Sequence, residues 1–255
     1  MSEQFDKLVN IVKKLRGPEG CPWDRKQNLY SLKSNIIEEA YELVDALDRK
    51  DIENIKEELG DLLLHVIFHS VIAEEENLFK LTDVINGLIN KLITRHPHVF
   101  GEQKIDTVEG VLINWEKIKK KEKKNSKSIV DGLPRSLPAI EKAKKIQKKA
   151  SYVGFDFPNK KECLKKIDEE LCELKEGINN KNRSEIFEEL GDLLFSIINL
   201  SRLLDINAEE ALRFANKKFM DRIRLIEDKL TKDNKSIEEI DPAERDRLWE
   251  ETKSK

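Results

Sequence analysis

The chain has 255 residues, with 50 acidic and 47 basic side chains and a net charge of −3. Charged residues make up 38% and aromatic residues only 6%, a balance that favours helices with solvated faces over a β-sandwich. The net charge gives no overall attraction for a polyanion, so we expect no nucleic-acid partner. Three cysteines without a CxxC pair, and no run near the ~18 apolar residues of a membrane span, predict a reducing, cytoplasmic location and no membrane partner.

Helical periodicity is the main local signal along the chain. Residues 31–49 have apolar side chains at helical spacing, namely Ile36, Ile37, Ala40, Leu43, Val44 and Leu47. Residues 51–75, with Asp51 as N-cap, and residues 81–95 predict two further helices. Residues 207–230 predict another, in which Asn207 and Glu210 have the spacing of a capping box. No segment alternates convincingly with period two, so we expect an all-α fold.

The heptapeptide EELGDLL occurs twice, at residues 57–63 and 188–194. With an offset of 131, residues 38–64 match residues 169–195 at 13 of 27 positions, and both copies are acidic at the same seven places. A segment rich in Lys, then in Gly and Pro, separates the copies. We therefore predict two tandem modules, residues 1–119 and 133–255, joined by a basic linker at residues 120–132.

The repeated acids form two helical pairs in each copy. Glu39 and Glu42 are three residues apart on one helix, and Glu58 and Asp61 have the same spacing on the next. A short connection makes the helices antiparallel neighbours, so four carboxylates converge and require protons or a cation. Hard oxygen ligands favour Mg²⁺ or Mn²⁺, and Mg²⁺ also accepts phosphate oxygens. The pattern therefore predicts an enzyme that acts on a phosphorylated substrate.

Two further expectations concern the packing around these acids. Three leucines follow Asp61 directly, which predicts that the second acidic helix is largely buried. Gly60 and Gly191 precede Asp61 and Asp192, and a mid-helix glycine costs about 1 kcal/mol, so we expect close helix approach there. The alternative is that the acids form only a solvated helix face. Two copies with identical spacing, each set against apolar residues, argue against this alternative.

These acidic pairs, sixteen residues apart, resemble the MazG family of nucleoside triphosphate pyrophosphohydrolases. The segments GCPWDRKQNLYSLKSNIIEEAYELVDAL, RHPHVFG and KIQKKASYVGFDF strengthen the resemblance, which covers essentially the whole chain in the order of the two-module bacterial members. The family implies an all-α fold in which helices of two subunits pack into a bundle, hence a homodimer. It also implies Mg²⁺-dependent attack of water between the α- and β-phosphates, which converts a nucleoside triphosphate to a monophosphate and pyrophosphate.

The resemblance also assigns residues. The implied metal ligands are Glu39, Glu42, Glu58 and Asp61 in the first module and Glu170, Glu173, Glu189 and Asp192 in the second, with Glu38 and Glu169 beside them in the catalytic set. The implied nucleotide-side residues of the second module are Lys166, Asn216, Lys218, Arg222 and Trp249. The first module keeps Lys91 and Arg95 but has Ile89 in place of the asparagine, which puts tight nucleotide binding there in doubt.

We predict an enzyme that accepts a broad range of nucleoside and deoxynucleoside triphosphates and acts in nucleotide-pool house-cleaning. One alternative is a narrower pyrimidine or deoxynucleotide pyrophosphatase of the same all-α superfamily. The other is a helical interaction protein stabilised by metal, without catalysis. An enzyme requires Lys218 and Arg222 near the acids, whereas a structural metal site does not.

Overall fold

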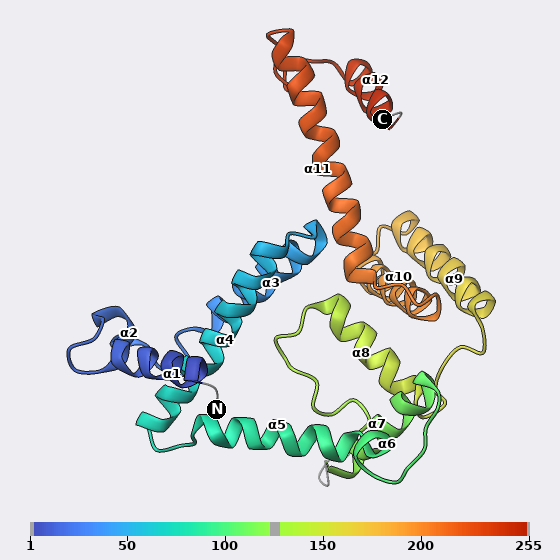
Figure 1. Cartoon of the computed structure of the whole chain (residues 1–255). Coiled ribbons are helices and arrows are strands. Elements are labelled where there is room, and N and C mark those ends of the chain that lie inside the picture. The colour runs from blue at the N-terminus through green and yellow to red at the C-terminus, as the bar shows by residue number, and fades with distance from the viewer. Residues whose placement is uncertain (1–2, 123–127, 254–255) are drawn as a thin grey trace. The chain divides into compact units, whose positions relative to one another are not determined.

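The computed structural model describes residues 3–122 and 128–253 of the chain (Figure 1). The described residues form twelve α-helices and contain no β-strand, which confirms the predicted all-α fold. None of the helices in this part of the chain is long and apolar enough to cross a membrane.

The chain divides into two units, Met1–Trp115 and Glu116–Lys255. The first contains α1 (Glu3–Arg16), α2 (Pro22–Lys26), α3 (Lys33–Arg49), α4 (Ile52–Glu75), α5 (Leu81–Arg95) and α6 (Pro97–Phe100). Helix α7 (Val108–Glu122) begins in this unit and ends in the next. The second contains α8 (Ala139–Ser151), α9 (Lys160–Asn179), α10 (Arg183–Leu203), α11 (Ala208–Lys232) and α12 (Pro242–Lys253). Of the predicted linker 120–132, residues 123–127 lie outside the described part.

The predicted helix starts follow local capping chemistry. Asp51 caps α4, and its carboxylate accepts a hydrogen bond from the Asn54 backbone N–H at 3.3 Å. Asn207 caps α11, but its side chain accepts from the backbone N–H of Glu209, at 3.2 Å, rather than from that of Glu210. The first turn of α11 is therefore capped one residue earlier than a capping box predicts.

The duplication is visible in the turn between the acidic helices. Lys50 and Lys181, 131 residues apart, lie in the turns that follow α3 and α9, and both adopt the left-handed conformation with φ of 56°. The residue after each donates its backbone N–H back into the helix at 3.0 Å, from Asp51 to Ala46 and from Asn182 to Gly177. This turn reverses the chain, so α3 packs on α4 and α9 packs on α10, as the short connections predict.

Buried apolar side chains gather where other helices cover these pairs. In the first unit α1 packs on the C-terminal half of α4, around Val12, Ile67, Phe68 and Ile72. In the second unit α8 and α9 pack on α10. A separate apolar cluster, containing Ile226, Leu230, Ile240 and Leu248, joins α11 to α12 and the segment before it. The N-terminal half of α4 lies outside the first core, and that half carries the acids.

Two packing expectations are wrong within the described chain. Leu63 and Leu64 remain 39% and 37% exposed, so the acidic half of α4 is not buried by its own chain. A Cβ added to Gly60 or Gly191 would meet no atom within 4 Å, so no helix approaches either glycine closely. The physical reason is that α3 and α9 cover only one face of their partner helices, and the glycines lie on another.

Candidate active site

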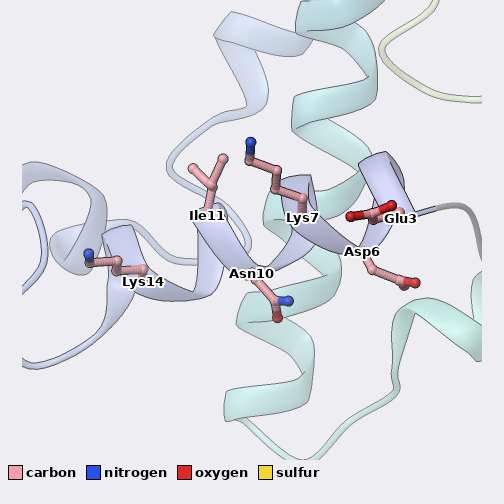
Figure 2. A pocket seen from close by; sticks show the side chains of 6 residues that line it. All are labelled: Glu3, Asp6, Lys7, Asn10, Ile11 and Lys14. Carbon is pink, nitrogen blue, oxygen red and sulfur yellow. The ribbon is translucent and has the colours of Figure 1, made fainter.

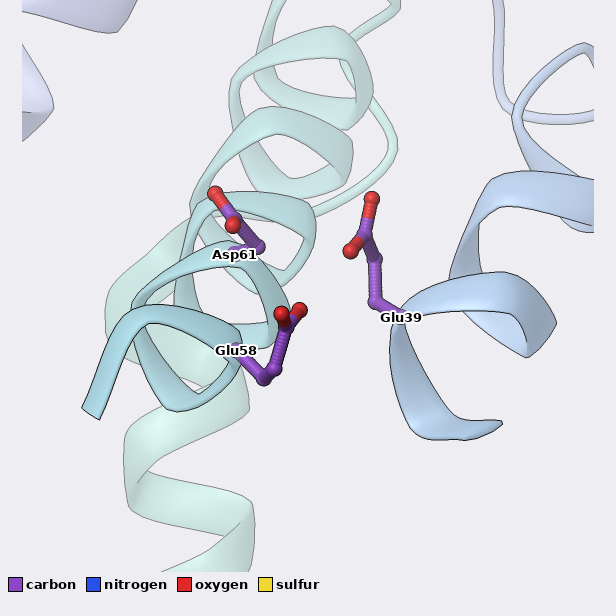
Figure 3. A group of neighbouring side chains, drawn as sticks. All are labelled: Glu39, Glu58 and Asp61. Atoms are coloured by element: carbon purple, nitrogen blue, oxygen red, sulfur yellow. The ribbon is translucent and has the colours of Figure 1, made fainter. Parts of the chain in front are cut away.

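Three carboxylates converge between α3 and α4. One oxygen each from Glu39, Glu58 and Asp61 lies within 4.8 Å of the other two, and Figure 3 shows Glu39 reaching from α3 toward the pair on α4. We call these three residues the N-terminal cluster. Glu42, the fourth predicted ligand, is exposed and lies outside this trio, as does Glu38. The structure thus brings together three of the four ligands predicted for this module.

The N-terminal cluster is electrostatically strained. Burial raises the pKa of Glu39, and the charges of Asp61, Glu42 and Glu58 raise it further. Burial also raises the pKa of Glu58, with Glu42 as the strongest neighbouring charge, so Glu42 contributes to the local field. The Oε2 atom of Glu58 is buried and lacks a hydrogen-bond partner among the described residues. A cation bound to a buried carboxylate oxygen that has no hydrogen-bond donor would offset the free-energy cost of burying that oxygen.

The second unit repeats the arrangement between α9 and α10. Oxygens of Glu170, Glu173 and Glu189 lie within 4.8 Å of one another, and we call these residues the C-terminal cluster. Glu170 is 4% exposed, whereas Glu173 is exposed. Asp192 lies outside the trio, but its charge, after burial and the charges of Glu173 and Glu170, raises the pKa of Glu189.

A lysine sits directly on the C-terminal cluster. Lys166 Nζ lies 2.6 Å from Glu169 Oε1 and 2.8 Å from Glu170 Oε1, one turn before them on α9. These two hydrogen bonds raise the pKa of the lysine, which therefore stays protonated at neutral pH. Burial raises the pKa of Glu173, while the nearby Lys166 charge opposes that effect. This unit thus carries an internal cation beside its acids.

The donor set of both clusters fits a hard divalent cation. All six residues offer carboxylate oxygens, the ligands that Mg²⁺ and Mn²⁺ prefer. Mg²⁺–oxygen distances of about 2.1 Å place opposite ligands about 4 Å apart. Oxygens already within 4.8 Å of one another therefore need only small side-chain rotations to share an ion.

The predicted nucleotide-side residues separate from the acids. Arg222 on α11 lies over the ring of Trp249 on α12, with 5.3 Å from Cζ to the ring centroid. Asn216 and Lys218 are exposed on α11. In the described part of the chain, no hydrogen bond or ion pair joins these four residues to the C-terminal cluster. Among the described residues of the second unit, Lys166 is the member of the predicted nucleotide side that contacts the acids.

The first unit contains a matching pair that the sequence interpretation missed. Arg95, at the end of α5, lies over the ring of Trp115 on α7, with 5.6 Å to the centroid. Lys91 is exposed one turn earlier on α5. The signal was present: Trp-Glu-x-x-Lys occurs at residues 115–119 and again at 249–253. In both copies the Glu and Lys of this motif form an ion pair, at 2.8 and 2.5 Å.

Two surface features are separate from the clusters. Figure 2 shows six side chains along α1, from Glu3 to Lys14, which border a hollow on the outer side of a single helix. In the second unit a cavity of about 360 Å³ lies between α8, α10 and the loop that precedes α9. Phe155, Phe157 and Phe195 line it. Gln147 also lines it, and its side-chain Nε2 donates a hydrogen bond to the Phe195 carbonyl at 2.7 Å. Neither feature contains a predicted site residue.

Comparison with known proteins connects this geometry to a family. The model of the MazG nucleotide pyrophosphohydrolase domain matches residues 27–100 and 159–224, which include both clusters. A nucleoside triphosphate pyrophosphohydrolase/pyrophosphatase MazG of Thermotoga maritima is 47% identical over 250 residues, 98% of this chain and 95% of that protein. A nucleoside triphosphate pyrophosphohydrolase of Escherichia coli K12 is 38% identical over 257 residues, 98% and 97% of the two chains. The protein YabN of Bacillus subtilis is 42% identical over 252 residues, which are 98% of this chain and 52% of YabN.

The fold and the paired carboxylates, matched by this domain in each half of the chain, define a helical metal-dependent hydrolase. Since the domain model covers more than half of the chain and two relatives match nearly all of it, the chain belongs to the MazG family.

Proposed function

We propose that the protein hydrolyses nucleoside triphosphates to nucleoside monophosphate and pyrophosphate, with Mg²⁺ as cofactor and Mn²⁺ as a substitute. The observation that carries this proposal is the convergence of three carboxylates from two antiparallel helices, repeated in both units. The activity for which the relatives from Thermotoga maritima and Escherichia coli are named supports the reaction class. We further propose a broad range of ribo- and deoxyribonucleotides, a cytoplasmic location and a role in nucleotide-pool house-cleaning.

The residues of the proposed site divide between metal binding, proton transfer and nucleotide binding. Glu39, Glu58 and Asp61, and in the second unit Glu170, Glu173 and Glu189, would hold the metal, with Glu42 and Asp192 completing each set. When bound, Mg²⁺ would neutralise phosphate charge and lower the pKa of a water molecule. A carboxylate of the set that does not bind the ion would take the proton of the attacking water. Lys166 would bind a phosphate oxygen, and Lys218, Arg222, Asn216 and Trp249 would orient the nucleotide.

We also propose that the active assembly is a homodimer. Several apolar side chains on α10 remain open in one chain, with Leu190, Leu194 and Ile197 exposed by 47%, 54% and 44%. Exposed apolar side chains at helical spacing on one helix support an interface at this surface. The open space beside Gly60 and Gly191 would admit a partner helix at close range. A partner copy would also supply the contacts that Lys218 and Arg222 do not make with the acids of their own chain.

A product assay with a defined panel tests the main proposal. Each ribo- and deoxyribonucleoside triphosphate is incubated with and without Mg²⁺, and the products are separated by anion exchange. We expect monophosphate and pyrophosphate in equal amounts, and no turnover in excess chelator. Diphosphate and inorganic phosphate as products would refute the cleavage position. Turnover confined to pyrimidine or deoxy substrates would favour the narrower pyrophosphatase, and no turnover at all would favour a metal-stabilised interaction protein.

A second candidate activity is hydrolysis of pyrophosphate itself. The name of the Thermotoga maritima relative includes pyrophosphatase. In this chain the N-terminal cluster is a second set of carboxylates. The position that corresponds to Lys166 at the offset of 131 is Asn35 there, so this set has no lysine at that position. This activity would release two inorganic phosphates for each triphosphate consumed in the product assay. Loss of that phosphate release in Glu58→Gln, but not in Glu57→Gln, would support it. A one-to-one yield of monophosphate and pyrophosphate, stable over time, would exclude it.

A further inference from the structure

The first glutamate of each cluster lies beside a different basic group. In the N-terminal cluster the imidazole Nε2 of His65, on α4, lies 4.0 Å from Glu39 Oε1. In the C-terminal cluster Lys166 Nζ, on α9, lies 2.8 Å from Glu170 Oε1. Glu39 and Glu170 are equivalent at the offset of 131. The basic partner therefore comes from the opposite helix in one unit and from the same helix in the other.

The exchange is reciprocal in the sequence. At the same offset, His65 corresponds to Ser196, whose side chain is too short to replace an imidazole, and Lys166 corresponds to Asn35, which carries no charge. Each unit therefore keeps one basic group beside its first glutamate and lacks the other. The His65 side chain is only 13% exposed, so its ring is fixed within the helix pair rather than free in solvent.

The surroundings of the imidazole fit a donor aimed at Glu39. Its Nδ1 atom is buried and has no hydrogen-bond partner in the described part of the chain. The tautomer with its proton on Nε2 avoids an unpaired N–H group at the buried Nδ1 atom, and its single donor then faces Glu39. The 4.0 Å separation exceeds the 2.7–3.2 Å of an N–H···O bond, and rotation of the flexible Glu39 side chain can close it.

We propose that His65 is a positioning residue of the N-terminal metal site, where its Nε2–H donates to Glu39 and holds that carboxylate for the cation. This inference rests on the proposed metal binding by both clusters. Partners that hydrogen-bond a ligating carboxylate change metal affinity by about 10- to 100-fold when they are removed. Lys166 has the opposite effect on its own cluster, because a cation that binds Glu170 must displace an ammonium group already bound there. The N-terminal cluster therefore takes up a divalent ion at lower concentration than the C-terminal cluster when nucleotide is absent.

The experiment measures Mn²⁺ binding to the full chain by electron paramagnetic resonance of the free ion, without substrate. A Glu189→Gln background silences the C-terminal cluster, so the remaining binding reports the N-terminal one. In it, His65→Leu removes the donor, and His65→Ser leaves a hydroxyl too short to replace the imidazole. His65→Gln keeps a donor of greater reach, and His69→Leu is a matched control on the same helix. A Glu58→Gln background isolates the C-terminal cluster, where Lys166→Met is compared with Lys165→Met, since Lys165 pairs with Glu162 outside the cluster.

We expect His65→Leu and His65→Ser to weaken Mn²⁺ binding by about 10- to 100-fold, while His65→Gln and His69→Leu stay near the parent. Lys166→Met should strengthen binding at the C-terminal cluster, and Lys165→Met should leave it unchanged. Unaltered affinity in His65→Leu and His65→Ser would overturn the inference. Equal weakening by His65→Gln and His69→Leu would also overturn it, because it indicates general disruption of α4. If neither background binds Mn²⁺, the metal role in the proposed function fails as well, which separates the two failures.

Discussion

Replacement of Glu189 by glutamine should change metal-linked stability without harming the fold. Burial and the charges of Glu173 and Glu170 raise the pKa of Glu189, so its ionised form is disfavoured when no cation is present. Glutamine has nearly the same shape and cannot ionise, so the melting temperature of the metal-free protein should stay equal or rise. The same change removes an oxygen from the C-terminal cluster, so the rise in melting temperature caused by Mg²⁺ should shrink.

The expected size follows from binding linkage. A ligand at 100 times its Kd stabilises the native state by about 2.7 kcal/mol. For a chain of this size each kcal/mol shifts the melting temperature by roughly 2–4 °C, so a saturated site adds roughly 5–10 °C. The Glu189→Gln protein should lose most of the Mg²⁺-induced rise in melting temperature that comes from the C-terminal cluster. The Lys166–Glu170 contact at 2.8 Å does not involve Glu189, so it should survive the substitution.

Differential scanning calorimetry with stepwise Mg²⁺ checks this expectation, and Glu188→Gln is the matched control. Glu188 is the adjacent residue on α10, exposed and outside the cluster. The control should keep the full Mg²⁺ response. A Glu189→Gln protein that melts lower than wild type without metal, yet shows an undiminished Mg²⁺ response, would refute the assignment of Glu189 as a ligand.

Three further predictions follow from the same clusters. The raised pKa of Glu58 means that its contribution to stability is present below the ordinary carboxyl range and is lost as pH rises through the folded-state value. The melting temperature of metal-free Glu58→Gln, relative to wild type, should therefore increase between about pH 4 and pH 7, and a flat difference would contradict the shift. Light scattering should give a mass near twice 29.7 kDa at micromolar concentration, and a monomer mass would exclude the proposed dimer. Glu173→Gln should reduce turnover at saturating Mg²⁺ more than Glu42→Gln, because Glu173 belongs to its trio whereas Glu42 lies outside its own; the reverse order would move the main site to the first unit.

The helices and their pairing could be predicted because the deciding interactions are local. Asp51 and Asn207 cap their helices through backbone N–H groups two or three residues away, and such contacts depend only on neighbouring residues. The acidic pairs face each other because a tight left-handed turn reverses the chain directly after α3 and α9. Spacing alone placed Glu39, Glu58 and Asp61 in one group for the same reason.

Interactions set by distant segments were not predicted. The Arg95–Trp115 pair was not predicted because the two arginine–tryptophan spacings differ. Trp115 lies 20 residues after Arg95, whereas Trp249 lies 27 residues after Arg222, so a single offset does not align the two pairs. Only the structure shows both tryptophan rings beneath an arginine, at 5.6 and 5.3 Å. The His65–Glu39 contact was missed because it depends on the rotational register of α4 against α3, which sequence spacing leaves open.

The errors about Gly60, Gly191 and the leucines have a common cause. An apolar residue on a helix predicts burial, but it does not say which surface provides the burial. In this chain the acids face the partner helix of their own pair, while the glycines and Leu190 face outward into open space. A mid-helix glycine costs about 1 kcal/mol and gains nothing where no backbone approaches. In the proposed dimer a partner helix packed there would offset this cost, so the same two glycines that contradict close packing within the chain are consistent with the proposed packing between copies.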